Sequence, residues 1–406
     1  MEINNKVEQP TAIVIGLSET GLGVARSLHR RGIRVIGLHS AGERPPAASS
    51  RHLEFVSGWE TEVPEAALEF LRKLLPGAGR GSVLLPTGDQ NLLFVHRHRH
   101  QLADDFRFYV WDSPLLEQMA SKRGLAGLAE RLGLPVPRTI VPESIDELKA
   151  GLKSLRFPCI VKPEYTHLWG TQAASELGVL GVKALPVGTP DELLTVYEKL
   201  HAAECPVIVQ EMILGPDENH VEYPALVGED GAILAEFVAR KIRVWPAHYG
   251  MGCLVESILA PDVVETGRLV IERLGYRGLA MVQFKRDSRD GRLYFLELNP
   301  RFTVWIGLPV ACGIDFPYYY YQLCIGRPFQ RPDRYKVGRL WWNPLRDVES
   351  MRTYLEDGTW TFRRWFTSIA RPHTNAYFAA DDMGPGFTAL GELFKKALGF
   401  LSRRGH

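Results

Sequence analysis

Three oxygen-bearing side chains lie near the two ends of one short stretch, AMVQFKRDSRDGRLYFLELNPRF (residues 280–302). The stretch predicts two strands joined by a three-residue loop at 289–291, which ends in the glycine that hairpin loops need. That loop sets Gln283 directly opposite Glu297, and Asn299 shares the face of Glu297 because it is two residues further along. A carboxylate and two amide oxygens suit Mg²⁺, which also takes oxygens from phosphate. A solvated polar hairpin is the alternative interpretation.

Two further stretches carry residue types that suit a nucleotide. Lys162 follows the apolar run of CIVKP, and a lysine at the end of a strand can contact phosphate as a point charge. In VIVQEMILGPDE, Glu211 ends a strand, an apolar linker follows, and Glu218 lies beyond a Gly-Pro turn. Backbone groups of such a linker could bind adenine, and a carboxylate could bind ribose hydroxyls. A lysine at a sheet edge and ordinary surface carboxylates are the alternatives.

The elements that must position these residues begin with a parallel α/β layer. An apolar run at 12–15, the loop GLSETGLG, a helical pattern and the strand IRVIGLHS form a β-loop-α-β unit. The loop glycines do not fit the G-x-G-x-x-G spacing, and no acidic residue ends the second strand, so we expect no NAD site.

The same layer still offers substrate-binding candidates. A helix start with free N–H groups suits an anion, which makes Ser18, Thr20 and Gly21 candidates. Asp89 follows a later strand and could hold an amino substrate, or it could cap the next helix.

Composition limits the classes of protein that need to be considered. The 406 residues suggest two or three domains, and 45% hydrophobic with 23% charged residues is typical of a soluble globular protein. A net charge of +1 argues against a broad surface for binding nucleic acid or an anionic membrane. The N-terminus lacks a signal peptide, no apolar run is long enough for a membrane span, and five scattered cysteines include no CxxC pair. We therefore expect a cytoplasmic protein.

In their order along the chain, the motifs resemble the ATP-grasp family from about Asp112 to Arg327. More narrowly, they are similar to its carboxylate–amine ligases of the D-aspartate ligase type. The motifs that carry the resemblance are SKRGLAGLAERLGLPVPRT, CIVKP, VIVQEMILGPDE, ARKIRVWPAHYG and FLELNPRF. The resemblance implies an α/β fold with an N-terminal parallel pre-ATP-grasp domain (1–112). It also implies an ATP-grasp domain of two α+β subdomains (113–330, lid about 140–205). After Pro328 the pattern weakens, and we interpret residues 331–406, which are rich in Trp, Arg and Pro, as a C-terminal extension.

The resemblance also implies an ATP site. In this site Lys122 and Lys162 would contact the phosphates. Adenine would be held by Glu211, Met212 and Ile213, and the ribose hydroxyls by Glu218. In the predicted lid, Trp169 beside His167 could contact nucleotide or substrate, or simply pack.

A magnesium site and a catalytic set follow from the same resemblance. The metal ligands would be Gln283, Glu297 and Asn299, and the catalytic residues would be Arg301, Lys241 and Arg243. Family members commonly carry a carboxylate at the position of Gln283, so we interpret Gln283 as a neutral ligand. Arg301 would face the transferred phosphoryl group, and the other two would support the phosphoryl or the carboxylate substrate.

The activity implied by the resemblance is an ATP-dependent ligase. It would join a small-molecule carboxylate to an amine through an acyl phosphate, with ATP and Mg²⁺ as cofactors and with release of ADP and phosphate. No nucleic acid or membrane partner is expected, and a homodimer stays open because such ligases commonly dimerise. Two alternatives also stay open: a small-molecule kinase, which needs no amine, and a non-catalytic nucleotide-binding regulatory protein, which Gln283 supports best.

Overall fold

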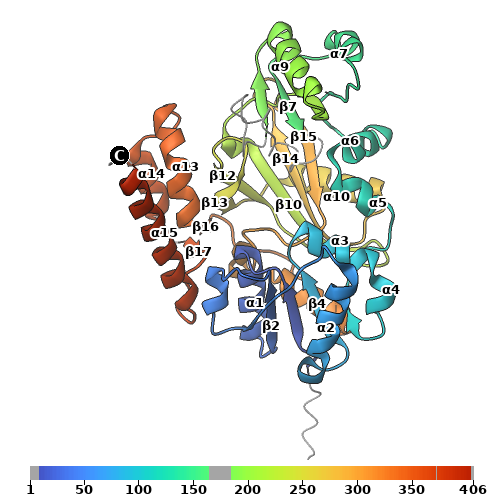
Figure 1. Cartoon of the computed structure of the whole chain (residues 1–406), viewed down its shortest axis with the longest axis vertical. Coiled ribbons are helices and arrows are strands. Elements are labelled where there is room, and N and C mark those ends of the chain that lie inside the picture. Colours follow the sequence, from blue (N-terminus) through green and yellow to red (C-terminus); the bar gives the residue numbers. More distant parts are fainter. Residues whose placement is uncertain (1–8, 164–183, 372, 404–406) are drawn as a thin grey trace, which may run out of the picture.

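The computed structural model describes residues 9–163, 184–371 and 373–403, and in these residues three sheets form (Figure 1). His167 and Trp169 lie outside the described residues, as do the side chains of Ala120, Lys122 and residues 396–403. A search of the described helices finds none with the length and apolar character that crossing a membrane requires.

The first sheet is parallel throughout, with strand order β3-β2-β1-β4-β5. Its strands are β1 (Ala12–Ile15), β2 (Val35–His39), β3 (Glu54–Ser57), β4 (Ser82–Pro86) and β5 (Phe106–Arg107), and its helices are α1 (Glu19–Arg30), α2 (Pro64–Ala78), α3 (Asp89–Arg97) and α4 (Arg99–Leu102). The short strands β1 and β4 are fully buried because apolar clusters pack on both faces. The predicted parallel α/β layer is confirmed.

The glycine-rich loop makes a tight turn from β1 into α1. A Cβ atom at Gly21 would lie 2.1 Å from the carbonyl oxygen of Gly16, so only glycine fits there. Gly16 itself has a φ of +100°, a conformation that favours glycine. Ser18 caps the helix, since its hydroxyl accepts a hydrogen bond from the backbone N–H of Thr20 at 3.3 Å.

Two helices, α5 (Leu115–Ala120) and α6 (Lys122–Arg131), lead to a four-stranded antiparallel sheet in the order β6-β9-β7-β8. The strands are β6 (Thr139–Ile140), β7 (Cys159–Pro163), β8 (Leu185–Val187) and β9 (Val207–Glu211). The helices α7 (Ile145–Leu152) and α9 (Pro190–Ala202) pack on one face against Val161 and Val209. Side chains alternate along a strand, so Lys162 and Gln210 lie on the other face.

The third sheet has eight strands, ordered β15-β14-β10-β12-β13-β16-β17, with β11 paired to β10. The strands up to β15 are β10 (His220–Val227), β11 (Ile233–Glu236), β12 (Ala239–Trp245), β13 (Met251–Ser257), β14 (Gly278–Arg286) and β15 (Leu293–Asn299). The sequence patterns EYPALVG and AILAEFVARKIR predict two strands joined by a turn at 229–231, and this hairpin is present, with Gly231 at a φ of +85°. The single strand predicted for AILAEFVARKIR (232–243) is wrong, because these residues form two strands. The chain bends at the buried pair Phe237 and Val238, so β11 and β12 pair with different parts of β10.

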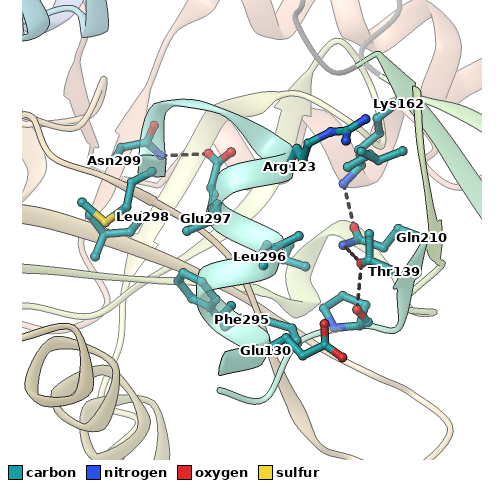
Figure 2. Close-up of a pocket in the computed structure, with 18 of the residues that line it drawn as sticks. Arg123, Glu130, Thr139, Lys162, Gln210, Phe295, Leu296, Glu297, Leu298 and Asn299 are labelled. Atoms are coloured by element: carbon teal, nitrogen blue, oxygen red, sulfur yellow. Dashed lines mark hydrogen bonds between the residues drawn. The ribbon is translucent and has the colours of Figure 1, made fainter. Parts of the chain in front are cut away.

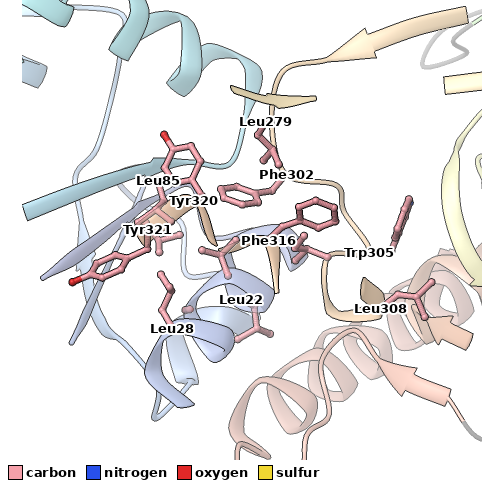
Figure 3. Packing of buried hydrophobic residues seen from close by; sticks show 14 of the residues in the cluster. Leu22, Leu28, Leu85, Leu279, Phe302, Trp305, Leu308, Phe316, Tyr320 and Tyr321 are labelled. Carbon is pink, nitrogen blue, oxygen red and sulfur yellow. The ribbon is translucent and has the colours of Figure 1, made fainter. Parts of the chain in front are cut away.

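Helix α10 (Pro261–Leu274) covers one face of this sheet, where Val282 and Phe284 are buried. Helices α11 (Gly307–Cys312) and α12 (Phe316–Cys324) instead join the third sheet to the first domain. Figure 3 shows Leu22 and Leu28 of α1 packed near Phe316 and Tyr321, in a cluster that includes buried residues of both domains. The two domains therefore share one core.

The C-terminal extension completes the third sheet and adds a layer of helices at its side (Figure 1). Its elements are β16 (Leu340–Trp342), α13 (Pro344–Glu356), α14 (Phe362–Ile369), β17 (His373–Asn375) and α15 (Gly384–Arg403). The buried pair Arg26–Asp382, with an N–O distance of 2.9 Å, fastens the extension to α1. The extension is thus integrated with both domains.

Candidate active site

The hairpin of β14 and β15 places Gln283 directly opposite Glu297, as predicted. The connection between the two strands is longer than the predicted three-residue loop, since β14 ends at Arg286 and β15 begins at Leu293. Near the turn the register pairs Phe284 with Phe295, and a β-bulge at Leu296 then shifts the register by one residue. Asn299 donates a hydrogen bond from Nδ2 to Glu297 Oε1 at 2.8 Å. The three predicted metal ligands therefore share one face of the hairpin, opposite the face that α10 covers.

Two buried charged residues extend this set across the sheet. Glu222 of β10 is the other register partner of Gln283, and Lys241 Nζ lies 3.1 Å from Glu222 Oε1. Lys241 Nζ also donates a hydrogen bond to the Gln283 amide oxygen at 3.2 Å, and Trp305 Nε1 donates to Glu222 Oε2 at 2.6 Å. Because the Glu222 carboxylate neutralises the Lys241 ammonium, a metal cation beside Gln283 would be repelled less by Lys241. We call Glu222, Lys241, Gln283, Glu297 and Asn299 the polar row.

Two basic residues continue the same face beyond the polar row. His220 and Lys285 are register partners on β10 and β14. Burial lowers the pKa of His220 well below its ordinary value, and the charges of Lys241 and Lys285 lower it further. Burial also lowers the pKa of Lys285. His220 is therefore uncharged at neutral pH, and Lys285 is the residue of this pair that could attract an anion such as phosphate.

Sequence reasoning did not single out Glu222, His220 or Lys285. A weak signal existed, because His220 and Glu222 are polar residues two apart in a strand that is otherwise apolar, and so share a face.

A cavity of about 890 Å³ opens beside the polar row. Its lining includes Glu297 and Asn299 from β15, Lys162 from β7 and Arg123 from α6 (Figure 2). Lys162 donates a hydrogen bond from Nζ to Gln210 Oε1 at 2.9 Å, so its ammonium is held on the cavity-facing side of the four-stranded sheet. The cavity brings two predicted metal ligands and one predicted phosphate contact together. Lys122 begins α6, and its side chain lies outside the described part of the structure.

Arg301 and Asp89 meet at the junction of the two domains. Arg301 donates from Nε to Asp89 Oδ1 at 2.5 Å and from Nη2 to Asp89 Oδ2 at 3.3 Å. Asp89 is the first residue of α3, and the residue before it, Gly88, occupies the N-cap position. The alternative that Asp89 caps this helix is therefore wrong. Asp89 lines the cavity and orients Arg301, a residue predicted to face the reacting groups.

The sequence matches no family model, but it is similar to curated ligases. It is 22% identical to D-aspartate ligase of Enterococcus faecium over 313 residues, which cover 72% of each chain. It is 29% identical to the carbamoyl phosphate synthase large chain of Deinococcus radiodurans over 231 residues, 54% of this chain but only 20% of that protein. It is 24% identical to D-alanine–D-alanine ligase of Pseudomonas entomophila over 201 residues, 46% of this chain and 58% of that protein.

Solved structures share the fold of this chain over most of its length. N5-carboxyaminoimidazole synthetase from Staphylococcus aureus superposes with a TM-score of 0.61 at 14% identity, covering 82% of this chain and 81% of that one. L-amino acid ligase from Bacillus licheniformis gives a TM-score of 0.56 at 16% identity, covering 78% and 74%. The chain has the ATP-grasp fold. The predicted lid (about 140–205) contains most of the four-stranded sheet, and the rest of the predicted ATP-grasp domain supplies the eight-stranded sheet up to β15.

The adenine-binding candidates of the ATP-grasp domain do not line the cavity. The Glu211 carboxylate is buried and accepts hydrogen bonds from the backbone N–H of Arg156 at 2.9 Å and from its guanidinium at 3.2 Å. The backbone N–H of Met212 donates to the carbonyl of Pro158, and its own carbonyl accepts from Arg289. Ile213 is buried. Adenine binding by these residues stays a prediction.

Arg243 and Glu218 contact the C-terminal extension. Arg243 is fully buried and forms two hydrogen bonds with Asp347, at 2.6 and 2.7 Å. Its guanidinium has no exposed surface from which to reach a substrate, so the ATP-grasp fold does not bring Arg243 to the cavity. Glu218 accepts a hydrogen bond from Arg364 Nη2 at 2.8 Å. Both partners come from a segment in which the sequence shows no motif.

The substrate candidates in the glycine-rich loop also lie near the extension. Thr20 is buried, whereas Ser18 is exposed and serves as the helix cap. Between them, the buried Glu19 carboxylate accepts hydrogen bonds from Asn343 Nδ2 at 2.9 Å and from the Tyr377 hydroxyl at 2.7 Å. The extension therefore anchors the start of α1.

The donor set fits a hard, weakly held cation. Among the described residues, no group of three His, Cys, Asp or Glu side chains could hold a metal ion. Within the polar row, the predicted ligands Gln283, Glu297 and Asn299 offer one carboxylate with two amide oxygens, which is an all-oxygen set of the kind that Mg²⁺ accepts. One negative charge is little for a divalent cation, so oxygens from a bound phosphate would have to complete the site.

Proposed function

We propose that the chain is an ATP-dependent ligase that joins a carboxylate to an amine and releases ADP and phosphate. The observation that carries this proposal is the convergence of Glu297, Asn299 and Lys162 on one cavity in an ATP-grasp fold. Lys162 and the acidic hairpin come from different subdomains, so a nucleotide between the subdomains could contact both. The names of the relatives, which include D-aspartate ligase and L-amino acid ligase, favour amino-acid-like substrates.

The chemistry needs few protein groups. ATP would supply the phosphoryl group that converts a poorly reactive carboxylate into an acyl phosphate, which the amine then attacks. Glu297, Asn299 and Gln283 would hold Mg²⁺, and Lys162 would neutralise charge on the phosphates. The proposed work of these residues is positioning and charge neutralisation, which dominate catalysis of phosphoryl transfer.

Lys241 and Arg301 would act at the other side of the reacting groups. Lys241 lies in the polar row next to Gln283, and Arg301 is held by Asp89 at the domain junction. Either cation could orient the carboxylate substrate, and Arg301 is the better candidate for the transferred phosphoryl group, since a guanidinium matches planar, bidentate anions.

Release of phosphate from ATP, measured against a panel of amino acids and small carboxylates, tests the proposal. Each acid is offered alone and then with each amine. A ligase releases ADP and phosphate only when both are present. Formation of ADP without an amine would favour a kinase, which keeps the phosphoryl group on its substrate, and AMP with pyrophosphate would exclude the acyl-phosphate route. Tight ATP binding without turnover across the whole panel would favour a non-catalytic nucleotide-binding protein.

A further inference from the structure

Two adjacent carboxylates in the turn before β10 are both held by the C-terminal extension. Asp217 and Glu218 lie in the short 3-10 helix Asp217–Asn219. The Tyr354 hydroxyl of α13 donates a hydrogen bond to Asp217 Oδ2 at 2.6 Å, and Arg364 of α14 donates one to Glu218 at 2.8 Å. A turn in the ATP-grasp domain is thus fixed by residues more than a hundred positions later in the sequence.

Asp217 is a rigid anchor for this turn. Its side chain is 4% exposed, and its Oδ2 atom also lies 3.3 Å from His248 Nδ1. Burial alone would raise the pKa of Asp217, but hydrogen bonds from His248 and Tyr354 outweigh it and lower the pKa. Asp217 therefore stays ionised at neutral pH, with two donors holding one of its oxygens. The backbone that carries Glu218 is fixed by its neighbour.

Arg364 is itself held from a second direction. Two guanidiniums lie over the Trp360 ring, with Arg364 Cζ at 3.9 Å and Arg243 Cζ at 4.5 Å from the ring centroid. Trp360 is buried, and Arg243 forms a buried ion pair with Asp347. Stacking on an aromatic face limits the rotamers of an arginine, so Arg364 presents its Nη2 atom to Glu218 from a prepared position.

The turn lies between the two parts of the proposed nucleotide site. It follows β9 and the linker at 212–214, which is predicted to bind adenine, and it leads directly into His220 and Glu222 of β10. The Glu218 side chain keeps 23% of its surface exposed, so it can still meet a ligand while Arg364 holds it. Among the contacts of the described residues, none links Arg364 to the predicted metal ligands of the polar row.

We propose that the C-terminal extension is a working part of the nucleotide site, in which Arg364 and Tyr354 are positioning residues that aim Glu218 at the ribose hydroxyls. This inference rests on the proposed function, since it needs ATP as the ligand. It assigns a role to an extension in which the sequence shows no motif.

Direct binding of ATP by calorimetry tests the inference without needing the other substrates. Arg364→Ala should raise the Kd for ATP about threefold, the effect of losing one partly exposed ion pair, and Arg364→Lys should recover part of the loss. The neighbouring Arg363 is exposed on the same helix, so Arg363→Ala is a matched control and should leave the Kd unchanged. Tyr354→Phe should act in the same direction as Arg364→Ala.

An analogue separates positioning from a general loss of structure. The Kd of 2′,3′-dideoxy-ATP should be the same for the unmodified protein and for Arg364→Ala, because this analogue has no ribose hydroxyls for Glu218 to bind. Equal weakening of both nucleotides would overturn the inference. So would weakening of ATP by Glu218→Gln but not by Arg364→Ala, which would leave the proposed function intact. Failure of the unmodified protein to bind ATP at all would instead overturn the proposed function.

Discussion

Gln283 lies directly opposite Glu297 in the hairpin, and its amide oxygen accepts a hydrogen bond from Lys241 at 3.2 Å. The glutamine therefore does two things that a carboxylate would do differently. It offers a neutral oxygen to a cation on one side, and it leaves Lys241 free to pair with Glu222 on the other. A glutamine at this position is consistent with a working metal site.

Substitutions at the two opposed positions should have unequal effects. Gln283→Glu should preserve Mg²⁺-dependent turnover and lower the Mg²⁺ concentration that gives half-maximal rate, because it adds a negative charge to the ligand set. Glu297→Gln should reduce turnover by more than about 100-fold, since it removes the only carboxylate among the three ligands. Titration of the initial rate with Mg²⁺ measures both. An unchanged Mg²⁺ dependence in Gln283→Ala would contradict the role assigned to Gln283.

The pair of Arg301 and Asp89 should matter more for activity than for stability. The Asp89 side chain is 55% exposed, so Asp89→Asn should change the free energy of unfolding by less than about 1 kcal/mol. The same substitution releases Arg301 from its oriented position and should lower kcat/KM. Urea unfolding and steady-state kinetics on one preparation compare the two effects. A loss of stability larger than the loss of activity would show that the pair is only structural.

Arg243 should be required for folding rather than for chemistry. Arg243→Met leaves Asp347 as an unpaired buried carboxylate and should cost about 3–5 kcal/mol of unfolding free energy. Asp347 also accepts hydrogen bonds from the indole N–H groups of Trp342 and Trp365. The double substitution Arg243→Met with Asp347→Asn keeps an acceptor for them and removes the unpaired charge, so it should be more stable than Arg243→Met alone. Urea denaturation measures the difference, and a fully stable Arg243→Met variant would refute the assignment.

Stability should depend on pH through His248. The hydrogen bond to Asp217, followed by the one to Asp357, raises the pKa of His248 from 6.5 to about 9. A raised pKa means that the stabilisation is fully present below about pH 6.5 and is lost as the pH rises to about 9. The ring is 34% exposed, so solvent screening limits the stabilisation to about 1 kcal/mol.

Unfolding free energies of the unmodified protein and of His248→Gln, compared from pH 6 to about 10, check this dependence. The two curves should converge at the alkaline end. His373→Gln is the control, because His373 is exposed and has no carboxylate partner among the described contacts. A difference between the two curves that does not change with pH would contradict the prediction.

Local patterns in the sequence sufficed for the hairpin and for the position of Lys162 near the end of a strand. Gln283 and Glu297 are only fourteen positions apart, so the turn residues and the two-residue period of a strand were enough to predict that they face each other. The β-bulge shifts the register near the turn, but Gln283 still pairs with Glu297. The parallel first domain was predictable for the same reason, because each β-loop-α-β unit is read from adjacent residues.

The other parts of the candidate site depend on partners that are far apart in the sequence. Arg243 looks like a substrate contact in its own motif, and only Asp347, 104 residues later, shows that it is buried in an ion pair. Likewise, Glu222 becomes part of the polar row because β10 lies between β12 and β14 in the sheet, so the spatial order of the strands differs from their order in the sequence. No short pattern encodes such a strand order.

Strand β16 pairs with β13 along the edge of the eight-stranded sheet, and β17 adds a further strand outside it. Six of the seven residues of β13 are buried. An apolar strand whose edge is open is a template on which other chains can add strands. The extension therefore also protects against self-association: a chain cut before β16 would expose β13 and be prone to aggregate, even if every residue of the cavity were intact.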